Sequence, residues 1–353
     1  MYMNKIKIAI IHDFLTDFGG AERILEVLAE MYPEAPIYTL LYDKKAMHGR
    51  FSKRVIHASF LQKFPKFLRR RKKWLLPLMP VAPEVFDLRD FDLVISSSGA
   101  WSKGIVTRVN TIHVSYLHSP MRFAWDANSE YLGQQKKNGA VRLCARLILN
   151  YIRVWDRAAA DRPDFLIANS KYTQVRIRKY YGRESQIIYP PVSKPTTDNR
   201  QPTIVVSGKA SIVGYFLVVS RLSPYKKIDM VVEAFNKLGL PLVVIGEGQQ
   251  EKYLRSIAAD NVKILGYQSN EKVAGYYAGA RAFVFAGVDD FGIAPVEAMA
   301  VGVPVVAIRK GGALEIVEEG KTGEFFDAAT PEVIADGIRR FMENESGYDR
   351  EYI

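Results

Sequence analysis

The sequence predicts an α/β protein of two doubly wound domains, and three observations lead to that prediction. The chain has 353 residues, too many for one ordinary core and enough for two domains of similar size. Short apolar runs, typical of strands buried on both faces of a parallel sheet, alternate with helix-like segments through both halves. A proline-bearing polar stretch interrupts this alternation between residues 189 and 202.

The first half opens with the beginning of a β-α-β unit. Ile6–Ile11 is a continuous apolar run, and a glycine-bearing loop and the periodic helix Ala21–Ala29 follow it. The later elements predicted here are strands at Leu93–Ser96, Ile112–Tyr116, Phe165–Ala168 and Ile187–Tyr189, and a helix at Val141–Arg157. Tyr189–Val192 (YPPV) cannot continue a helix or a central strand, so with Ser193–Pro202 it predicts an interdomain linker.

The second half repeats the alternation. Its apolar runs predict five strands, at Phe216–Val219, Leu242–Ile245, Val262–Ile264, Ala282–Phe285 and Pro304–Ala307. The segments between them predict helices at Met230–Leu238, Gln250–Ala259, Asn270–Gly279 and Ala294–Val301. The predicted domains are therefore residues 1–193 and 203–340, followed by a C-terminal segment over 341–353.

Composition narrows the class of protein. Hydrophobic residues make up 48% and charged residues 25%, as in a globular enzyme. The single cysteine, Cys144, excludes an internal disulfide framework and fits a reducing compartment. The N-terminal residues lack the features of a signal peptide, and no run of roughly 18 apolar residues could span a bilayer. We therefore expect a cytoplasmic protein.

The net charge of +11 is unevenly distributed. Residues 1–200 carry 33 Lys and Arg against 18 Asp and Glu, whereas residues 201–353 carry 16 against 20. The basic half suits an anionic surface, either lipid or nucleic acid. Within it, Phe60–Leu76 (FLQKFPKFLRRRKKWLL) interleaves basic with aromatic and aliphatic residues, which favours a short element bound peripherally to the inner face of the cell membrane. A solvated loop and a nucleic-acid-binding segment are the alternatives.

In parallel doubly wound sheets, ligands bind beyond the carboxyl ends of the strands, so we expect the site in the loops there. After Phe216–Val219 come Arg221 and Lys226, just before a helix whose N-terminus is electropositive. Two cations at a helix start suit a diphosphate, with a solvated loop as the alternative. After Leu242–Ile245, the Gly246-Glu247-Gly248 turn lets backbone approach a ligand, although most turns of this kind are only turns.

The loop after Ala282–Phe285 carries the strongest signal, Val288–Ala300 (VDDFGIAPVEAMA). Gly292 lets the first amides of the next helix point at phosphate or sugar oxygens. Glu297 lies about one turn inside that helix among apolar neighbours, and a carboxylate in such surroundings needs a partner. A vicinal diol such as that of ribose would supply one.

Two features of the first half also lie in strand-end loops. Gly19 and Gly20 open the first predicted helix, where backbone N–H groups meet anions, although a plain flexible helix entry is equally compatible. This pair is not a GxGxxG dinucleotide fingerprint. His118 follows the strand Ile112–Tyr116 at its carboxyl end, a position suited to chemistry.

Other site chemistries find no support. No HExxH or Cys/His pair has zinc-ligand spacing, and neither a Walker A loop nor a G-x-S-x-G elbow is present. Asp90-Phe91-Asp92 matches the Asp-x-Asp pattern of metal-dependent sugar transferases, but it precedes the strand Leu93–Ser96. A ligand belongs at the other end of a strand, so we expect a loop there and no catalytic metal.

Taken together, these residues resemble the retaining glycosyltransferases of the GT-B fold, specifically family 4 (group 1). The resemblance covers nearly the whole chain and is strongest in the second half: Arg221 with Lys226, Leu265-Gly266-Tyr267, and Asp290–Ala300. In the first half, Gly19–Arg23 (GGAER) and Leu117–Asp126 (LHSPMRFAWD) look like the branch that contains O-antigen and exopolysaccharide mannosyltransferases. The implied fold is two Rossmann-like domains with a cleft between them.

The resemblance also implies roles for individual residues. Arg221 and Lys226 would neutralise the donor diphosphate, while Glu297 would hold the ribose hydroxyls. His118 would lie next to the transferring sugar. The other residues implied at the nucleotide sugar are Gly19, Gly20, Gly246, Tyr267, Phe291, Gly292, Ile293 and Ala294.

The same resemblance implies the reaction and its partners. The donor would be a GDP- or UDP-linked sugar, with GDP-mannose favoured by the branch, and the acceptor a lipid-linked or polysaccharide hydroxyl. Transfer would proceed with retention, and the first domain, 1–193, would bind the acceptor. A nucleotide-sugar epimerase of the same fold and a basic nucleic-acid-binding protein are the alternatives, although we expect no nucleic acid partner.

Two departures from the family pattern stand out. The family's Glu-x7-Glu motif ends at Glu297, and its first position is Asp289 in this sequence. The shorter side chain would alter how the donor sugar's hydroxyls are held. Family members usually end with a helix that crosses back to the first domain, so residues 341–353 would be the beginning of a truncated C-terminal segment.

Overall fold

The computed structural model describes residues 6–126, 139–192, 204–206, 209–211 and 214–353. It separates into two compact units, Met1–Pro191 and Val192–Ile353, each described here by itself. The predicted linker Ser193–Pro202 lies outside the described residues. Residues 341–353 belong to the second unit, where Tyr348 stacks on Phe341 with 5.2 Å between the ring centroids.

The first unit is built on a seven-stranded sheet in the order β3-β2-β1-β4-β5-β6-β7, with every pair of neighbours parallel. The strands are β1 Ile8–Leu15, β2 Ile37–Tyr42, β3 Ile56–Ala58, β4 Leu93–Ser98, β5 Ile112–Leu117, β6 Phe165–Ala168 and β7 Gln186–Ile187. The parallel pairing places the carboxyl ends of β1, β4 and β5 at one edge.

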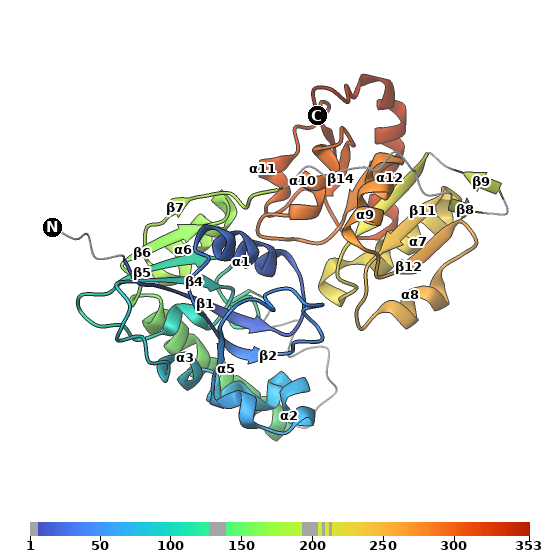
Figure 1. The fold of residues 1–353 in the computed structure, drawn as a ribbon. Coiled ribbons are helices and arrows are strands. Elements are labelled where there is room, and N and C mark those ends of the chain that lie inside the picture. The colour runs from blue at the N-terminus through green and yellow to red at the C-terminus, as the bar shows by residue number, and fades with distance from the viewer. Residues whose placement is uncertain (1–5, 127–138, 193–203, 207–208, 212–213) are drawn as a thin grey trace. The chain divides into compact units, whose positions relative to one another are not determined.

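Helices cover both faces of this sheet (Figure 1). Figure 1 shows α1 on one face and α3 and α5 on the other. Successive side chains of β1 point to opposite faces of the sheet. Ile10 packs with Leu25 of α1, whereas Ile11 belongs to a separate hydrophobic cluster. The helical segments are α1 Gly20–Met31, η1 Phe60–Lys63, α2 Lys66–Arg70, η2 Lys72–Leu78, α3 Val81–Glu84, η3 Ser102–Gly104, α5 Gly139–Ala159 and α6 Lys171–Tyr181.

The second unit contains a six-stranded parallel sheet in the order β12-β11-β10-β13-β14-β15. The strands are β10 Tyr215–Val219, β11 Leu242–Ile245, β12 Val262–Gly266, β13 Ala280–Phe285, β14 Val305–Ile308 and β15 Gly323–Phe326. A short antiparallel pair, β8 Ile204–Val206 and β9 Lys209–Ser211, precedes it. The strand order reverses direction at β10, which is the switch point where doubly wound folds bind ligands.

The core of the second unit lies on both sides of its sheet. Phe216 and Val218 of β10 pack toward α7 and α12, while Leu217 packs in the cluster that contains residues of α9 and α10. The helices are α7 Ile228–Leu238, α8 Glu251–Ile257, α9 Asn270–Ala278, α10 Ile293–Met299, α11 Ala313–Ile316 and α12 Pro331–Glu343, with 3₁₀ turns η4 Pro224–Lys226 and η5 Glu345–Gly347. Both units therefore have the predicted Rossmann-like architecture.

Several elements differ from the sequence prediction. The first strand continues to Leu15, beyond the predicted end at Ile11, because the polar His12 and Asp13 have partners within the unit. The prediction also missed several elements, among them β2, β3, β15, α6 and α12. Within the described residues, no helix is both long and apolar enough to cross a membrane.

A buried ion pair joins α5 to the loop after β4. The ammonium of Lys103 and the carboxylate of Asp156 form a salt bridge in which the two side chains are 1% and 0% exposed. Asp156 also accepts hydrogen bonds from Trp125 Nε1 at 2.7 Å and Tyr181 Oη at 2.8 Å. One carboxylate thus holds three segments of the first unit together.

Replacing Lys103 with Met should lower the free energy of unfolding of this unit by about 3–5 kcal/mol, because it leaves a buried carboxylate without its cation. All four tryptophans lie in the first unit, so urea unfolding followed by tryptophan fluorescence reports on this unit. The exposed pair Arg89–Asp87 supplies the control, Arg89→Met, which should change stability far less because water screens the pair. Equal losses in both variants would contradict this role.

Candidate functional site

In the second unit, the loops after β10 and β11 are bound to each other. The N–H of Ser220 donates to Ile245 O at 3.0 Å, and that of Leu222 donates to Glu247 O at 3.0 Å. Gly246 has φ +136, and a Cβ there would lie 1.9 Å from Ser220 O. This glycine, predicted to approach a ligand, is therefore required for the close packing of the two loops.

Lys226 meets Asp289 at the carboxyl edge of this sheet. Its Nζ donates to Oδ1 at 2.7 Å and to Oδ2 at 2.5 Å, and the side chains are only 14% and 22% exposed. Lys226 ends η4 after β10, and Asp289 lies in the loop after β13. The sequence analysis treated the two residues separately, whereas the structure brings them together as one ion pair.

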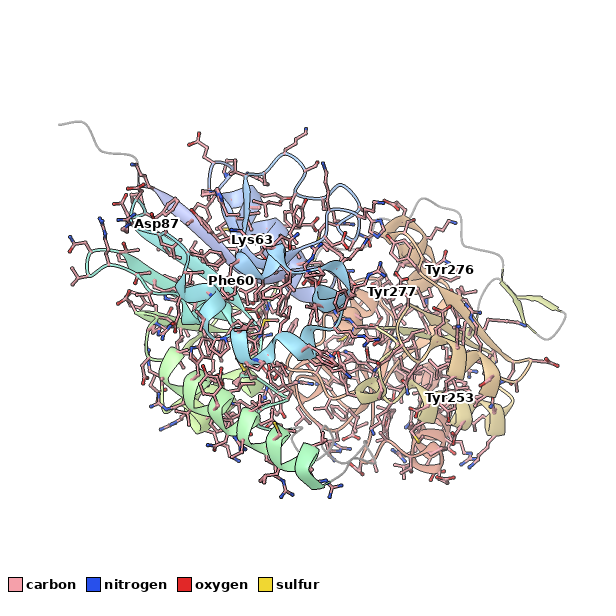
Figure 2. The ribbon with its side chains drawn as sticks, turned by 90° about the horizontal axis from the view of Figure 1, so that it is seen from below. Phe60, Lys63, Asp87, Tyr253, Tyr276 and Tyr277 are labelled. Atoms are coloured by element: carbon pink, nitrogen blue, oxygen red, sulfur yellow. The ribbon has the colours of Figure 1, made fainter. Side chains whose placement is uncertain are left out.

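Glu297 has a partner within the second unit itself, whereas a ribose diol is the partner that the sequence led us to expect. Tyr277, a buried residue of α9, donates its hydroxyl to Glu297 Oε2 at 3.0 Å. Figure 2 labels Tyr277 and its neighbour Tyr276 on this helix. Tyr277 was not predicted from the sequence. Its hydroxyl, on the helix that precedes β13, could have suggested a hydrogen-bond partner for Glu297.

The turn between β13 and α10 is held by the loop that follows β14. Gly292 has φ +103, a left-handed conformation that favours glycine, and it directly precedes Ile293, the first residue of α10. The N–H of Gly312 donates to Asp289 O at 2.9 Å. The Gly311-Gly312 step after β14 was not singled out in the sequence. Phe291, Ile293 and Ala294 lie in this turn and are partly exposed.

Two further predicted residues are solvent-exposed at the same edge. Arg221 lies in the loop after β10 that also carries Lys226. Tyr267 directly follows β12 and is 57% exposed. Both are thus accessible to a ligand beyond the carboxyl ends of the strands.

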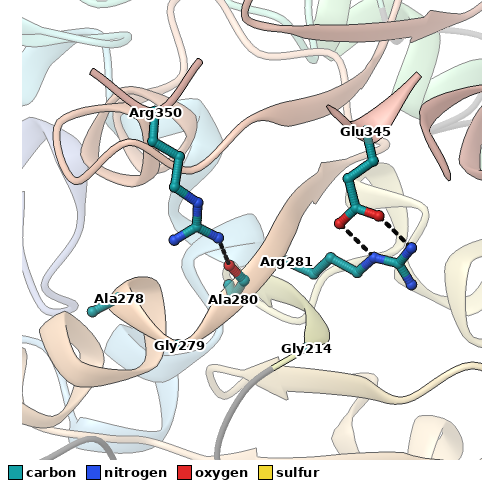
Figure 3. A pocket seen from close by; sticks show the side chains of 7 residues that line it. All are labelled: Gly214, Ala278, Gly279, Ala280, Arg281, Glu345 and Arg350. Atoms are coloured by element: carbon teal, nitrogen blue, oxygen red, sulfur yellow. Dashed lines mark hydrogen bonds and ion pairs between the residues drawn. The ribbon is translucent and has the colours of Figure 1, made fainter. Parts of the chain in front are cut away.

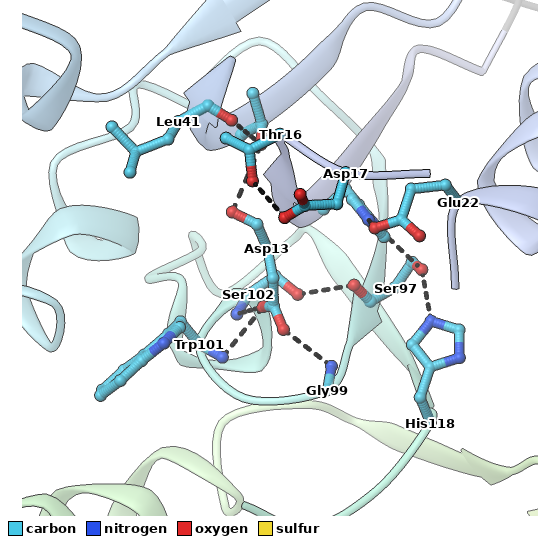
Figure 4. Close-up of polar contacts among 12 residues, drawn as sticks. Asp13, Thr16, Asp17, Glu22, Leu41, Ser97, Gly99, Trp101, Ser102 and His118 are labelled. Atoms are coloured by element: carbon cyan, nitrogen blue, oxygen red, sulfur yellow. Dashed lines mark hydrogen bonds and ion pairs between the residues drawn. The ribbon is translucent and has the colours of Figure 1, made fainter. Parts of the chain in front are cut away.

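In the first unit, a polar centre forms at the ends of β1, β4 and β5 (Figure 4). Ser97 Oγ lies 2.7 Å from His118 Nε2 and 3.0 Å from His12 Nδ1, so one hydroxyl links two imidazoles. His12 Nε2 in turn lies 3.4 Å from Glu22 Oε1. Burial, followed by the charge of His12, lowers the pKa of His118 to about 4. The His118 imidazole is therefore neutral at pH 7.

Asp13 fixes the loop beside this centre. Its carboxylate accepts backbone N–H groups from Gly99 at 2.8 Å, Trp101 at 2.9 Å and Ser102 at 2.6 Å. Three charge-assisted hydrogen bonds satisfy an otherwise costly buried carboxylate. The sequence analysis missed His12, Asp13 and Ser97, although His12-Asp13 stands directly after the first apolar run.

The Gly19-Gly20 pair lies at the start of α1, as predicted. Gly19 is the N-cap and Gly20 the first helical residue, and the cap makes no side-chain hydrogen bond. The backbone of Gly19 is extended, with φ −155, which any residue can adopt. Backbone geometry at Gly19 therefore gives no reason for glycine.

The opposite edges of the sheets carry other features. Asp90 and Asp92 precede β4, and Asp92 Oδ2 accepts the N–H of Lys7 at 2.9 Å. Among residues that the structure describes, no group of three or more His, Cys, Asp or Glu could hold a metal ion. A pocket of about 370 Å³ lies at the amino end of β13, where Arg281 binds Glu345 (Figure 3). It lies at the end of the sheet opposite to the Lys226–Asp289 pair.

The buried histidines predict a pH-dependent stability of the first unit. Burial lowers the pKa of His113 to about 3 and that of His118 to about 4, from an ordinary 6.5. The unfolded chain thus binds protons that the folded chain excludes, so stability should fall as the pH drops from about 6.5 toward 4. His113→Gln should reduce that loss in urea unfolding between about pH 7 and pH 5. An unchanged loss in the variant would contradict the assignment.

Two protein families account for nearly the whole chain. The family described as "Glycosyltransferase Family 4" matches residues 18–194, and "Glycosyl transferases group 1" matches residues 201–353. These matches meet where the structure divides into its two units.

Curated relatives are similar over part of their length. A GDP-mannose-dependent alpha-(1-6)-phosphatidylinositol monomannoside mannosyltransferase of Mycobacterium tuberculosis is 29% identical, over 53% of this chain and 54% of the relative. A GDP-mannose-dependent alpha-mannosyltransferase of Corynebacterium glutamicum is 33% identical, over 34% of this chain and 29% of the relative. The chain thus spans about half, or less, of the length of these relatives.

Solved structures share the fold along nearly the whole chain. Anabaena HepE in complex with UDP and glucose has a TM-score of 0.66 at 19% identity, covering 97% of this chain and 91% of that one. Sucrose-phosphate synthase from Thermosynechococcus elongatus has a TM-score of 0.66 at 16% identity, with the same coverage. Together with the family matches, these similarities establish that the chain belongs to glycosyltransferase family 4 and has the GT-B fold.

Proposed function

We propose that this protein transfers mannose from GDP-mannose to a hydroxyl of a lipid-linked or polysaccharide acceptor, with retention of configuration and without a catalytic metal. The observation that carries this proposal is the part-buried Lys226–Asp289 ion pair at the carboxyl edge of the second unit's sheet. It places a fixed cation at the switch point where this fold binds nucleotides.

The chemistry of the donor explains why a fixed cation matters. Breaking a sugar–diphosphate bond builds negative charge on the leaving phosphate, and preorganised charges stabilise it. Asp289 holds Lys226 in place, so little reorganisation is needed when the charge develops. Arg221, exposed in the same loop, supplies a second cation. Amides around Phe291–Ala294 would meet sugar and phosphate oxygens.

Glu297 in the second unit and His118 in the first have further proposed roles toward the donor. The Glu297 carboxylate accepts the Tyr277 hydroxyl at Oε2, which orients it, and we assign this carboxylate to the ribose hydroxyls. The neutral His118 imidazole, oriented by Ser97, suits a hydrogen bond to the transferring sugar. At the start of α1, Gly19 and Gly20 would offer backbone N–H groups to a phosphate.

The proposal of mannose as the donor sugar and guanine as its base rests only on the names of similar proteins. Both relatives described above are GDP-mannose-dependent, whereas Anabaena HepE was crystallised with UDP and glucose. Thermal-shift measurements with GDP-, UDP- and ADP-sugars separate these donors, since a ligand at one hundred times its Kd adds about 2.7 kcal/mol of stability. Stabilisation by a UDP-sugar alone would overturn the choice of GDP-mannose.

Lys226→Ala should lower kcat at least about tenfold, since one charged hydrogen bond is worth about 1.5–3 kcal/mol. Mannosyl transfer from GDP-mannose is measured at saturating donor, with and without EDTA, and EDTA should have no effect. Lys237→Ala is the matched control, because Lys237 forms an ion pair with Glu332 on the surface of the same unit. Near-normal turnover in Lys226→Ala would remove the diphosphate assignment.

We also propose that the first unit binds an anionic membrane surface, which would bring it to a lipid-linked acceptor. Phe67 of α2 and Trp74 of η2 are 64% and 63% exposed. The helix α5, which packs against η2, exposes Leu143, Leu147 and Val154. These three share one helical face, and Arg142 and Arg146 lie beside it. Exposed apolar groups flanked by basic residues are typical of interfacial helices.

Trp74→Ser combined with Leu147→Ser should reduce sedimentation with vesicles that contain anionic lipid, because both changes remove apolar contact area. Val175→Ser is the control, since Val175 is equally exposed on α6. Vesicle binding that does not depend on the anionic lipid content, or that is unchanged in the double variant, would contradict the proposed membrane association.

A further inference from the structure

A second concentration of charge lies in the first unit, outside the histidine centre. A pocket of about 540 Å³ lies between the loop after β1, the end of β2 with its loop, and the η1–α2–η2 segment. Its lining contains six cationic side chains against two carboxylates. The cations are Lys44, Lys45, Lys66, Arg69, Arg70 and Lys72.

Hydrogen bonds hold the walls of this pocket in place. Gln62 of η1, the segment labelled by Phe60 and Lys63 in Figure 2, donates Nε2 to Tyr42 O at 2.9 Å and accepts Tyr42 N–H at 3.1 Å. Lys72 Nζ donates to Thr16 Oγ1 at 2.6 Å. Figure 4 shows Thr16 in the group that includes Asp13. The pocket is therefore connected to the histidine centre through β1, which carries His12 and continues into the loop of Thr16.

The two carboxylates do not neutralise the lining. Asp43 Oδ1 already accepts the backbone N–H groups of Lys45 at 3.0 Å and Ala46 at 3.4 Å. Asp17 is 68% exposed and lies 3.4 Å from Lys72. Within the described part of the chain, Lys72 is the one cation of the six with a carboxylate partner.

Arg69 gives an independent sign that a ligand is expected. Its Nε is buried and has no hydrogen-bond partner among the described residues. A buried donor without a partner costs free energy, and native proteins rarely leave one unsatisfied. A guanidinium in this position suits an oxyanion, which accepts paired hydrogen bonds from its planar fork.

We infer that this pocket binds a phosphate or diphosphate group of the acceptor. The inference rests on the proposed function and specifies its acceptor class. A multiply charged phosphate matches the excess of cations better than a single carboxylate does. The pocket lies after β1 and β2, at the same edge of the sheet as His118 after β5. An acceptor anchored there reaches the edge at which we place transfer.

The pocket also separates the cations of the basic segment 60–76 into two groups. Four of its seven cations, Lys66, Arg69, Arg70 and Lys72, line the pocket, whereas Lys63, Arg71 and Lys73 do not. From the sequence, the whole segment was expected to face one anionic surface. We therefore assign the four pocket cations to the phosphate, which leaves the other three for the proposed lipid surface.

The test is calorimetric titration of inorganic pyrophosphate into the Lys226→Ala protein, in which the donor site is weakened. Adding Arg69→Gln and Arg70→Gln should weaken binding at least about tenfold, because two charged hydrogen-bond donors are lost. Adding Arg71→Gln and Lys73→Gln, from the same segment, should change it less than about twofold. Circular dichroism checks that every variant is folded.

Three results would overturn the inference. The first is a failure of the Lys226→Ala parent to bind pyrophosphate, and the second is an equal weakening of pyrophosphate binding by both pairs of substitutions. In the third result, the Arg69→Gln/Arg70→Gln pair abolishes binding to vesicles and leaves pyrophosphate binding unchanged. The last result would assign these arginines to a lipid surface. The donor is tested separately by thermal shift with GDP-mannose, which should stabilise the Arg69→Gln/Arg70→Gln protein as it does the unaltered one. If GDP-mannose stabilises neither of these two proteins, the proposed function is wrong, regardless of the result with pyrophosphate.

Discussion

The ion pair between Lys226 and Asp289 joins two loops that are 63 residues apart in the chain. Both loops follow strands that are direct neighbours in the second sheet, β10 and β13. Parallel pairing brings their carboxyl ends to one edge, and the ion pair then fixes the ammonium among partly buried groups. The Gly292 turn and Glu297 follow β13 from the same edge, so the proposed donor site depends on this pairing.

In the first unit, parallel strands also bring polar side chains together at one edge of the sheet, but these side chains are of a different chemical type. The ends of β1, β4 and β5 bring His12, Ser97 and His118 together around one hydroxyl. Burial keeps His118 neutral, which suits a hydrogen-bonding role rather than that of a fixed charge. Positive charge is instead concentrated in the neighbouring pocket and on α5. The net charge of the first half is therefore spread over separate surfaces.

The sequence predicted the architecture because each buried strand is a local apolar run. Phe165–Ala168 and Leu242–Ile245 were predicted with their observed bounds. The positions of Lys226, Asp289 and Glu297 at one sheet edge followed from strand order. Which side chains pair could not be predicted, because the Lys226–Asp289 and Tyr277–Glu297 contacts depend on how loops and helices pack. The pocket around Arg69 likewise requires β2, whose run after Pro36 was overlooked.

Hydrogen exchange in the presence of GDP-mannose tests the central claim most directly. If the donor diphosphate binds beside Lys226 and Asp289, amide exchange should slow in residues 221–228 and 287–297. Exchange in β15, at the far edge of the same sheet, should not change. Protection of other segments alone, at a GDP-mannose concentration that stabilises the protein, would contradict the proposed donor site.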